Sequence, residues 1–384
     1  MHEAPQPAKA PFSFIVLMAS LISIVAISID ALLPALGYIA QDFSLSNPNH
    51  VQYVVGCIFL GLAIGELVCG PLSDAWGRKP VLYLGLGLYL IGSIMCYMAG
   101  SFEWLLIGRT VQGLGVAGPY ISAVSIVRDK YSGRHMAQVM SVVMMIFILV
   151  PAIAPALGQG ILFIGDWRDI FILYMAYSIS IVCWLAIKQE ETLPKEHRMP
   201  FRLGTIGHAL QEISSNTTTL CYTLCMGLCF GSFFGYLNAS QQIFQVQFET
   251  GEWFTAYFGG LALVLGLASL SNSRIVVRLG MRYICIRAMA TIVVASLLFL
   301  ALHAFTSITL VMFLIYAAVL FFCFGLMFGN LNAIAMEPMG HIAGTASAVM
   351  GATSSIMAMI LGAIIGQLYA VSYTHLTLPT KRIV

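Results

Sequence analysis

Long apolar runs alternate with short polar segments along almost the whole chain. Each run approaches or exceeds the roughly 20 residues that a membrane-spanning helix needs, and none has the strict alternation of a transmembrane β-strand. The pattern therefore predicts an all-α polytopic membrane protein. The predicted spans are 13–38, 51–70, 80–99, 104–127, 137–162, 169–188, 217–241, 253–271, 283–302, 307–332 and 342–368.

The longest polar connection, 189–216, separates six spans from five and contains an amphipathic segment near 203–213. Two related groups of spans on either side of a loop are typical of transporters built from repeats. We therefore expect a six-helix half at 1–188, a linker at 189–216 and a second half with five helices at 217–370.

Lysine and arginine predict the orientation, because short cytoplasmic loops carry an excess of both. Alternate connections contain nearly all of these bases. The connections on the other side contain a single base, Arg168. We expect the N-terminus and the linker to be cytoplasmic. The bases on that side are Lys9, Arg78, Lys79, Arg128, Lys130, Arg134, Lys188, Lys195, Arg198, Arg202, Arg274, Arg278, Arg282 and Arg287.

An odd number of spans would leave the C-terminus outside with Lys381 and Arg382, against this rule. The last residues, 371–384, are polar and contain a proline. We interpret them as a non-native tail that follows the loss of a twelfth helix, with an authentic short exposed tail as the alternative.

Composition agrees with a membrane protein and excludes several functions. The chain is 59% hydrophobic and 9% charged, whereas soluble domains are about a quarter charged. The net charge of +2 forms no basic patch for nucleic acid. Cys221, Cys225 and Cys229 share one helix face, but no histidine or carboxylate accompanies them, so packing is favoured over a metal site. We expect no cofactor and no metal.

The segment GPLSDAWGRKP, residues 70–80, concentrates charge between two apolar runs. Gly70 permits close helix approach and Gly77 permits a tight turn. Asp74 can pair with Arg78, which together with Lys79 also sets the topology. Asp129, at the end of the fourth span, is a second candidate partner for Arg78.

Two further motifs lie inside spans. LLIGRTVQGLGVAG, 105–118, contains a membrane-embedded arginine, and VPAIAPALGQG, 150–160, contains two prolines and two glycines. Pro151 and Pro155 each remove a backbone donor. With Gly158 they predict a bend that seals or hinges a cavity, and an ordinary kinked span is the alternative.

Together these segments resemble the motifs of the major facilitator superfamily. The first span, SIDALLPALGYIAQDF, and the segments IVRDKYS and GTASAVMG are similar to its Bcr/CflA-type (bicyclomycin/chloramphenicol-resistance) drug:proton antiporters. The resemblance covers about residues 12–370 and implies a fold of two six-helix halves. It also implies that the network around Arg78 closes the halves on the cytoplasmic side. The family often has Met-Tyr after the aspartate of the first span, whereas this chain has Ala31 and Leu32.

Asp30 and Arg109 are charged residues inside spans. Such residues usually face a cavity or pathway, since each costs about 2.5–3.5 kcal/mol on insertion scales. At about 1.5 Å per residue, Asp30 and Arg109 lie roughly 12 Å and 8 Å from the same face. We hypothesise that they share one cavity, where Asp30 couples protons to a cationic substrate and Arg109 tunes its proton affinity. The alternatives are a structural aspartate and an arginine bonded to backbone carbonyls.

Glu66 lies near the cytoplasmic end of the second span, away from that cavity, and is expected to be a structural or gating partner. The weaker candidates for cavity-lining residues are Tyr38, Tyr120, Phe234, Asn238 and Gln241.

These features favour a secondary exporter of small drug-like compounds that exchanges them for protons across the bacterial inner membrane. A metabolite or sugar-derivative transporter of the same superfamily is the alternative. No catalytic cluster or phosphate-binding loop supports an enzyme or an ATP-driven pump. The expected partners are a small-molecule substrate, protons and the lipid bilayer, and we expect a monomer.

Overall fold

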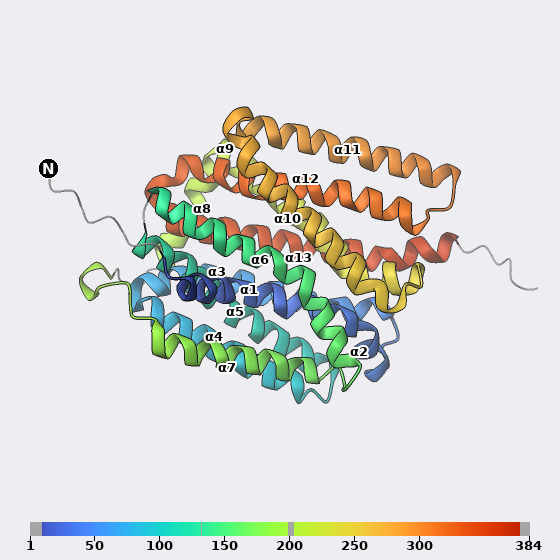
Figure 1. Cartoon of the computed structure of the whole chain (residues 1–384), viewed down its shortest axis with the longest axis horizontal. Coiled ribbons are helices and arrows are strands. Elements are labelled where there is room, and N and C mark those ends of the chain that lie inside the picture. Colours follow the sequence, from blue (N-terminus) through green and yellow to red (C-terminus); the bar gives the residue numbers. More distant parts are fainter. Residues whose placement is uncertain (1–9, 132, 199–202, 377–384) are drawn as a thin grey trace, which may run out of the picture.

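The structure is a computed structural model that describes residues 10–131, 133–198 and 203–376 (Figure 1). The described residues form helices and connecting turns, without strands. The helices of the first half and the linker are α1 (Phe12–Asp30), η1 (Leu33–Ala35), α2 (Leu36–Asp42), η2 (Pro48–Gln52), α3 (Tyr53–Trp76), α4 (Arg78–Tyr97), α5 (Phe102–Lys130), α6 (Gly133–Leu162), α7 (Asp169–Lys188), η3 (Lys195–His197) and α8 (Leu203–Ser215). Those of the second half are α9 (Thr217–Gln241), η4 (Gln242–Gln247), η5 (Gly251–Trp253), α10 (Phe254–Leu279), α11 (Met281–Phe305), α12 (Leu310–Met336), η6 (Glu337–Ile342) and α13 (Ala343–Leu376).

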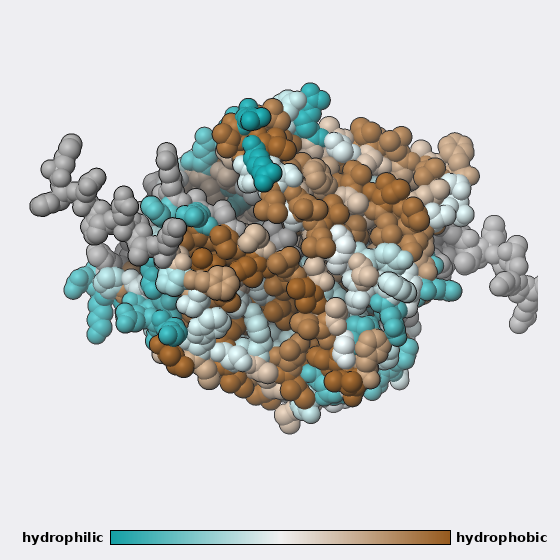
Figure 2. All heavy atoms as spheres, viewed as in Figure 1, coloured by the Kyte–Doolittle hydropathy of each residue, from teal (hydrophilic) through white to brown (hydrophobic). Residues whose placement is uncertain are grey.

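The described part of the chain has 11 helical segments long and apolar enough to cross a membrane. This confirms the predicted spans, and several helices extend a few residues beyond their predicted ends. In the space-filling view, hydrophobic residues cover the middle of the face shown and hydrophilic residues gather toward its two ends (Figure 2). That distribution fits helices whose middles contact lipid and whose ends contact water.

The spans before and after the linker form two bundles, which occupy the lower and upper parts of Figure 1. Two pairs of helices make most of the contact between them, α3 with α13 and α6 with α10. The first bundle is tightly packed at small residues. A Cβ atom on Gly61 of α3 would overlap the carbonyl oxygen of Thr110 of α5. Glycine there lets the two backbones touch, as small residues do in membrane helix interfaces.

The first span is broken in its interior. α1 ends at Asp30, and the chain continues through the short helix η1 into α2. Pro34 lies in the first turn of η1, and its missing N–H prevents a continuous helix at this point. A Cβ on Gly158 of α6 would overlap the carbonyl oxygen of Ala31. Gly158, in the proline-containing segment 150–160, therefore packs directly against the break in the first span.

The linker helix α8 forms where the amphipathic segment predicts it. Its apolar residues Ala209 and Ile213 join Ala346 and Val349 of α13 in one buried cluster. The linker is thus packed against the second half through its own helix.

The last helix extends into the segment that the sequence analysis interprets as a tail. α13 continues through Leu376, whereas the sequence places the start of the tail at 371. Residues 371–376 contain neither proline nor glycine, so nothing in them terminates a helix. The rest of the predicted tail, 377–384, lies outside the described residues.

The three cysteines with helical spacing have different surroundings. Cys221 is exposed, Cys225 is half-buried, and Cys229 packs with Cys285 and Cys323 in an apolar cluster between α9, α11 and α12. Among the residues that the structure describes, no three His, Cys, Asp or Glu side chains are grouped so that they could hold a metal ion.

Candidate functional site

Asp30 occupies the break in the first span and is buried, with 4% of its surface exposed. Its carboxylate accepts no hydrogen bond from any residue in the described ranges. The phenol groups of Tyr174 in α7 and Tyr236 in α9 lie within electrostatic range of it. A buried carboxylate without a fixed partner is unusual, and here it faces side chains from both halves of the molecule.

The guanidinium of Arg109 is fully buried and bonds to three helices. Its Nε donates to the carbonyl oxygen of Val54 in α3 at 3.0 Å and its Nη2 to that of Ser28 in α1 at 2.9 Å. Its Nη1 donates to Oε1 of Gln112 in α5 at 2.8 Å. These contacts match the alternative in which Arg109 bonds backbone carbonyls. It forms no ion pair with Asp30.

The carbonyl of Ser28 links Arg109 to the break in the first span. It also accepts a hydrogen bond from the hydroxyl of Tyr174 at 3.2 Å, and the Ser28 hydroxyl bonds that of Tyr89 at 2.8 Å. These hydrogen bonds fix Ser28, which lies two residues before Asp30 in the last turn of α1. The sequence placed Asp30 and Arg109 at similar depth, and the structure brings them to neighbouring positions joined through Ser28.

The second half contributes an aromatic and amide surface from α9. Phe234 is buried and packs on Phe59 of α3, with ring centroids 4.1 Å apart. Asn238 is also buried, and its Oδ1 has no hydrogen-bond partner among the described residues. Nε2 of Gln241 donates to Gln245. A Cβ on Gly37 of α2 would lie 3.1 Å from Nε2 of Gln241, so the end of α9 touches the first span.

Tyr236 is a residue of this surface that the sequence did not single out. Its ring packs on Phe258 and Phe321, with centroids 5.9 and 4.9 Å away. Its buried hydroxyl has no hydrogen-bond partner in the described part of the chain. The sequence offered no signal for it, because Tyr236 stands within an apolar run rich in aromatic residues.

The two remaining cavity candidates lie elsewhere. Tyr38 is 55% exposed, on the outer face of α2. Tyr120 is half-buried in α5 and within electrostatic range of Glu66. The structure therefore brings Phe234 and Gln241 to the contact between the halves, with Asn238 buried between them in α9, and it places Tyr38 outside that contact.

Glu66 lies at the contact between α3 and α13. Its Oε2 accepts a hydrogen bond from the Ser355 hydroxyl at 3.1 Å. One turn further along, a Cβ on Gly70 would lie 3.5 Å from Cβ of Ala348. These contacts join the two halves near the end of the molecule that carries Arg78, which we call the basic end.

Arg78 is buried and pairs with two carboxylates. Its Nη1 lies 2.5 Å from Oδ1 of Asp74 and its Nε 2.9 Å from Oδ2 of Asp129. The side chain of Lys79 lies instead over the ring of Tyr83. All these residues belong to the first half. Contacts that cross to the second half at this end include those of Glu66 and Gly70.

The linker completes this network through Glu191, which the sequence did not identify. Its carboxylate accepts hydrogen bonds from the backbone N–H groups of Arg78 and Lys79, each at 3.0 Å. Gly77 has φ +109°, and a Cβ there would meet Oε2 of Glu191. The next residue, Thr192, donates to Asp129 at 3.0 Å. A carboxylate at a helix N-terminus is favourable. The sequence did not reveal this pairing because Glu191 lies far from Arg78 along the chain.

The proline-containing helix α6 belongs to the first half and packs against α10 of the second half. It runs from Gly133 to Leu162 with Pro151 and Pro155 inside it. Between the prolines, the carbonyl oxygen of Ala152 would lie 2.9 Å from a Cβ on Gly259 of α10. Together with Gly158, which packs on the broken first span, these residues put α6 in contact with both halves.

The opposite end of the interface is joined by uncharged amides, and we call it the amide end. Gln242 donates to Oδ1 of Asn49 at 2.7 Å and accepts from Nε2 of Gln52 at 3.1 Å. Nε2 of Gln367 donates to the Asn49 carbonyl at 3.0 Å. These bonds connect η2 of the first half to η4 and α13 of the second.

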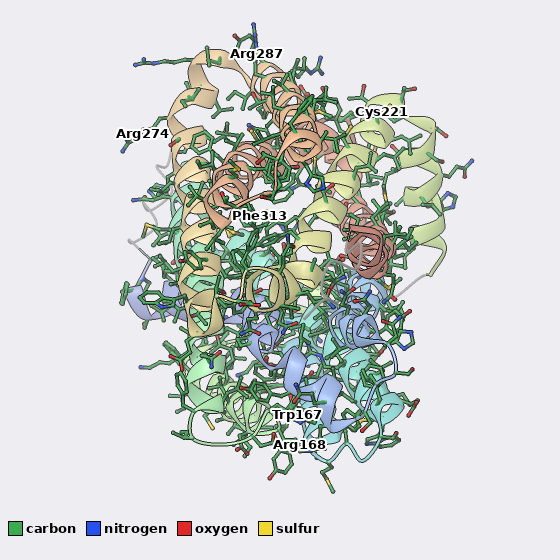
Figure 3. All side chains as sticks on the ribbon, turned by 90° about the vertical axis from the view of Figure 1, so that its right-hand side faces the viewer. Trp167, Arg168, Cys221, Arg274, Arg287 and Phe313 are labelled. Atoms are coloured by element: carbon green, nitrogen blue, oxygen red, sulfur yellow. The ribbon has the colours of Figure 1, made fainter. Side chains whose placement is uncertain are left out.

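A surface ion pair lies near the same end. Arg168 and the indole N–H of Trp167 both donate to Oδ2 of Asp42, at 2.7 and 3.2 Å. Figure 3 views the molecule from this end and shows Trp167 and Arg168 side by side, far from Arg274 and Arg287. This contact stays within the first half, so the amide bonds are the polar connection between the halves here.

Comparison with known proteins gives the same family over most of the chain. The model of the Major Facilitator Superfamily matches residues 17–363. An uncharacterized MFS-type transporter, YdgK of Bacillus subtilis, is 28% identical over 97% of this chain and 92% of its own. A bicyclomycin resistance protein homolog of Haemophilus influenzae is 27% identical over 94% of this chain and 90% of its own.

The fold has also been observed in solved structures. The crystal structure of a D-xylose-proton symporter superposes with a TM-score of 0.69 at 13% identity, covering 94% of this chain and 92% of that one. At this identity the likeness concerns the fold alone.

Proposed function

The chain belongs to the major facilitator superfamily, and we propose that it exports small drug-like compounds in exchange for protons. Membership in this family makes it a multi-pass membrane transporter and not an enzyme, as the sequence indicated. The relative named for bicyclomycin resistance supports a drug-like substrate.

The observation that carries the proposal is Asp30, buried at a break in the first span. Because its carboxylate accepts no hydrogen bond among the described residues, no fixed donor holds it in one protonation state. It can take up a proton from one side and release it to the other as the halves move. Arg109 acts on it as a positioning residue, since its hydrogen bond to Ser28 fixes the turn before Asp30.

The surroundings of Asp30 favour a substrate that is partly apolar and cationic. Tyr236, whose phenol lies within electrostatic range of Asp30, belongs to a group of stacked aromatic rings in the second half that includes Phe258. A cation near aromatic faces is stabilised by about 0.5–2 kcal/mol, in addition to its attraction to the carboxylate. A proton and a cationic substrate would then compete for Asp30, which is the simplest form of exchange.

The two ends of the interface supply the contacts that alternate during transport. At the amide end, Gln242 bonds Asn49 and Gln52 across the halves. At the basic end, Glu66 bonds Ser355. The excess of bases there supports a cytoplasmic location for this end in the bacterial inner membrane. Breaking one set of contacts while keeping the other would open Asp30 to one side at a time.

The proposal is tested by efflux from cells that express the full chain. Cells are loaded with a cationic dye or with a chloramphenicol-like compound, and efflux is followed with and without a proton uncoupler. We expect export that the uncoupler abolishes and that Asp30→Asn lowers at least tenfold. Glu252→Gln, which removes an exposed carboxylate, is the matched control and should export normally. Export that continues with the uncoupler present would refute proton exchange.

A further inference from the structure

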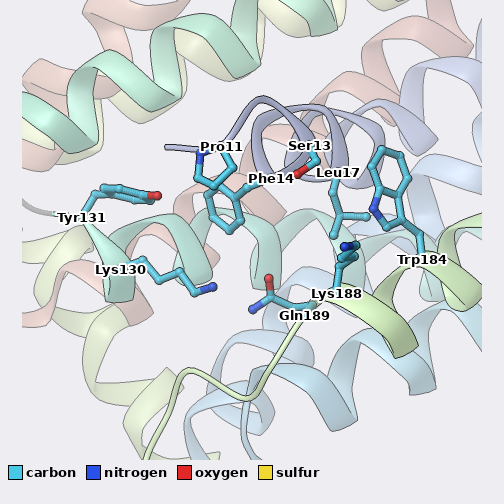
Figure 4. Close-up of a pocket in the computed structure, with 9 residues that line it drawn as sticks. All are labelled: Pro11, Ser13, Phe14, Leu17, Lys130, Tyr131, Trp184, Lys188 and Gln189. Carbon is cyan, nitrogen blue, oxygen red and sulfur yellow. The ribbon is translucent and has the colours of Figure 1, made fainter. Parts of the chain in front are cut away.

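A pocket of about 230 Å³ opens at the basic end, outside the contact between the halves. Figure 4 shows it between the first turns of α1 and the ends of α5 and α7. Pro11, Phe14 and Leu17 come from the start of the first span, Lys130 from the end of the fourth and Lys188 from the end of the sixth. At about 30 Å³ per water molecule, its volume exceeds that of several waters.

The pocket lies at the boundary between membrane and water. Three candidate spans have their ends at its rim, starting at Phe12 or ending at Lys130 and Lys188. Apolar side chains beside it, Phe12 and Ile187, are 75% and 78% exposed. Side chains of this type at the end of a span contact lipid, so the pocket is next to the bilayer.

The pocket is positively charged and lacks a balancing acid. Lys130 and Lys188 both line it, and neither forms an ion pair with a described carboxylate. None of the described residues that line it is acidic. Two like charges brought to one pocket repel each other, which an anion placed between them would relieve.

The remaining lining residues fit the glycerol region of a lipid. The ring of Phe14 lies 5.0 Å from Nζ of Lys130 and 5.7 Å from the ring of Tyr131. Trp184 borders the other side, and its indole N–H donates no hydrogen bond within the described ranges. Tryptophan and tyrosine are enriched at this depth of a membrane. The pocket therefore combines cationic groups, one free donor and an apolar floor.

We propose that this pocket binds the phosphate group of an anionic phospholipid from the leaflet at the basic end. Lys130 and Lys188 contact the phosphate, the Trp184 indole N–H donates to a headgroup or glycerol oxygen, and Phe14 with Leu17 contacts the start of an acyl chain. Basic pockets between membrane helices bind anionic headgroups in this way. Bound lipid would connect α1, α5 and α7, the helices whose ends surround it.

The test measures lipid retained by the full chain in native mass spectrometry with phosphatidylglycerol or phosphatidylethanolamine. We expect selective retention of phosphatidylglycerol. Each lysine should contribute about fivefold to this affinity, so Lys130→Gln with Lys188→Gln should lower it more than tenfold. The control pair Lys195→Gln with Arg278→Gln removes two exposed charges outside the pocket and should change it less than twofold.

A second variant keeps both lysines and changes the pocket. Ser13 is exposed and lines it, so Ser13→Glu should fold normally and reduce phosphatidylglycerol binding as the lysine pair does. A competition with inorganic phosphate distinguishes a site for a lipid headgroup from a site for free phosphate. Millimolar phosphate should fail to displace the lipid. Equal binding of both lipids, full binding by the lysine variant or displacement by phosphate alone would each overturn the proposal.

Discussion

The carboxylate of Glu191 accepts a hydrogen bond from the backbone N–H of Arg78 at 3.0 Å. The linker between the halves therefore caps the helix that begins with the charged loop of the first half. The same linker continues into α8, which packs on α13. Movement of the second half can thus be transmitted to the charged loop through the backbone of the linker, in addition to side-chain contacts.

Glu191→Gln should weaken this cap while keeping the shape of the side chain. Loss of a cap costs about 0.5–2 kcal/mol. The glutamine side chain keeps one acceptor oxygen and has an NH2 group in place of the other. We expect a lower melting temperature in detergent and slower export. Glu190→Gln, one residue earlier and exposed, is the control, and equal effects of the two substitutions would contradict the capping role.

Arg78→Lys should be severely impaired although it keeps the charge. Lysine lacks the planar fork of donors with which the guanidinium bonds Asp74, Asp129 and Ser73 together. Breaking a buried pair costs about 3–5 kcal/mol, and less here because Asp74 is partly exposed. Melting temperature and export should both fall, with a smaller effect for Lys79→Gln. The prediction fails if the two variants behave alike.

Arg109→Lys separates a positioning role from a purely electrostatic one. A lysine at this position keeps the positive charge but lacks the planar fork with which Arg109 bonds the carbonyls of Val54 and Ser28 together. A hydrogen bond to a charged group contributes about 1.5–3 kcal/mol. We expect lower stability and loss of proton-driven export. If charge alone matters, Arg109→Lys would retain both the stability and the proton-driven export of the unsubstituted protein. The hydrogen bonds to α1 and α3 would then contribute to neither.

The amide end should close and open during each transport cycle. Gln52→Cys with Gln242→Cys replaces a pair that is hydrogen-bonded at 3.1 Å. In a background without reactive cysteines, a short thiol crosslinker should stop export, and a reductant should restore it. Unchanged export after complete crosslinking would show that this end does not need to open.

Gly61→Ala should destabilise the first half. A Cβ there overlaps the carbonyl of Thr110, whereas one on Gly87 would meet nothing within 4 Å. Overpacking costs about 1–3 kcal/mol, so the melting temperature should fall for Gly61→Ala and remain unchanged for Gly87→Ala. Equal melting temperatures would contradict the close contact of α3 with α5.

The spans and the family could be predicted from the sequence because both are local properties. Hydrophobic runs fix the helices, and the segment 70–80 has its own recognisable spacing. The similar depth of Asp30 and Arg109 also followed from their positions along two helices. Their connection through Ser28 did not, because it uses a backbone carbonyl that no side-chain pattern records.

The residues that the sequence missed act across long separations. Glu191 reaches Arg78 over 113 positions, and Gln242 reaches Asn49 over 193. Neither stands in a motif, and polar residues at span ends are ordinary. Tyr236 was missed for the opposite reason, since its run contains many aromatic residues and only the structure distinguishes the one near Asp30.

The role of Asp30 in coupling transport to protons can be measured with reconstituted protein. Proteoliposomes containing the full chain or Asp30→Asn are given a pH gradient, and substrate accumulation is compared with exchange of labelled for unlabelled substrate. We expect Asp30→Asn to retain measurable exchange but to lose accumulation driven by the gradient. Accumulation by Asp30→Asn equal to that of the unsubstituted protein would show that Asp30 does not couple transport to protons.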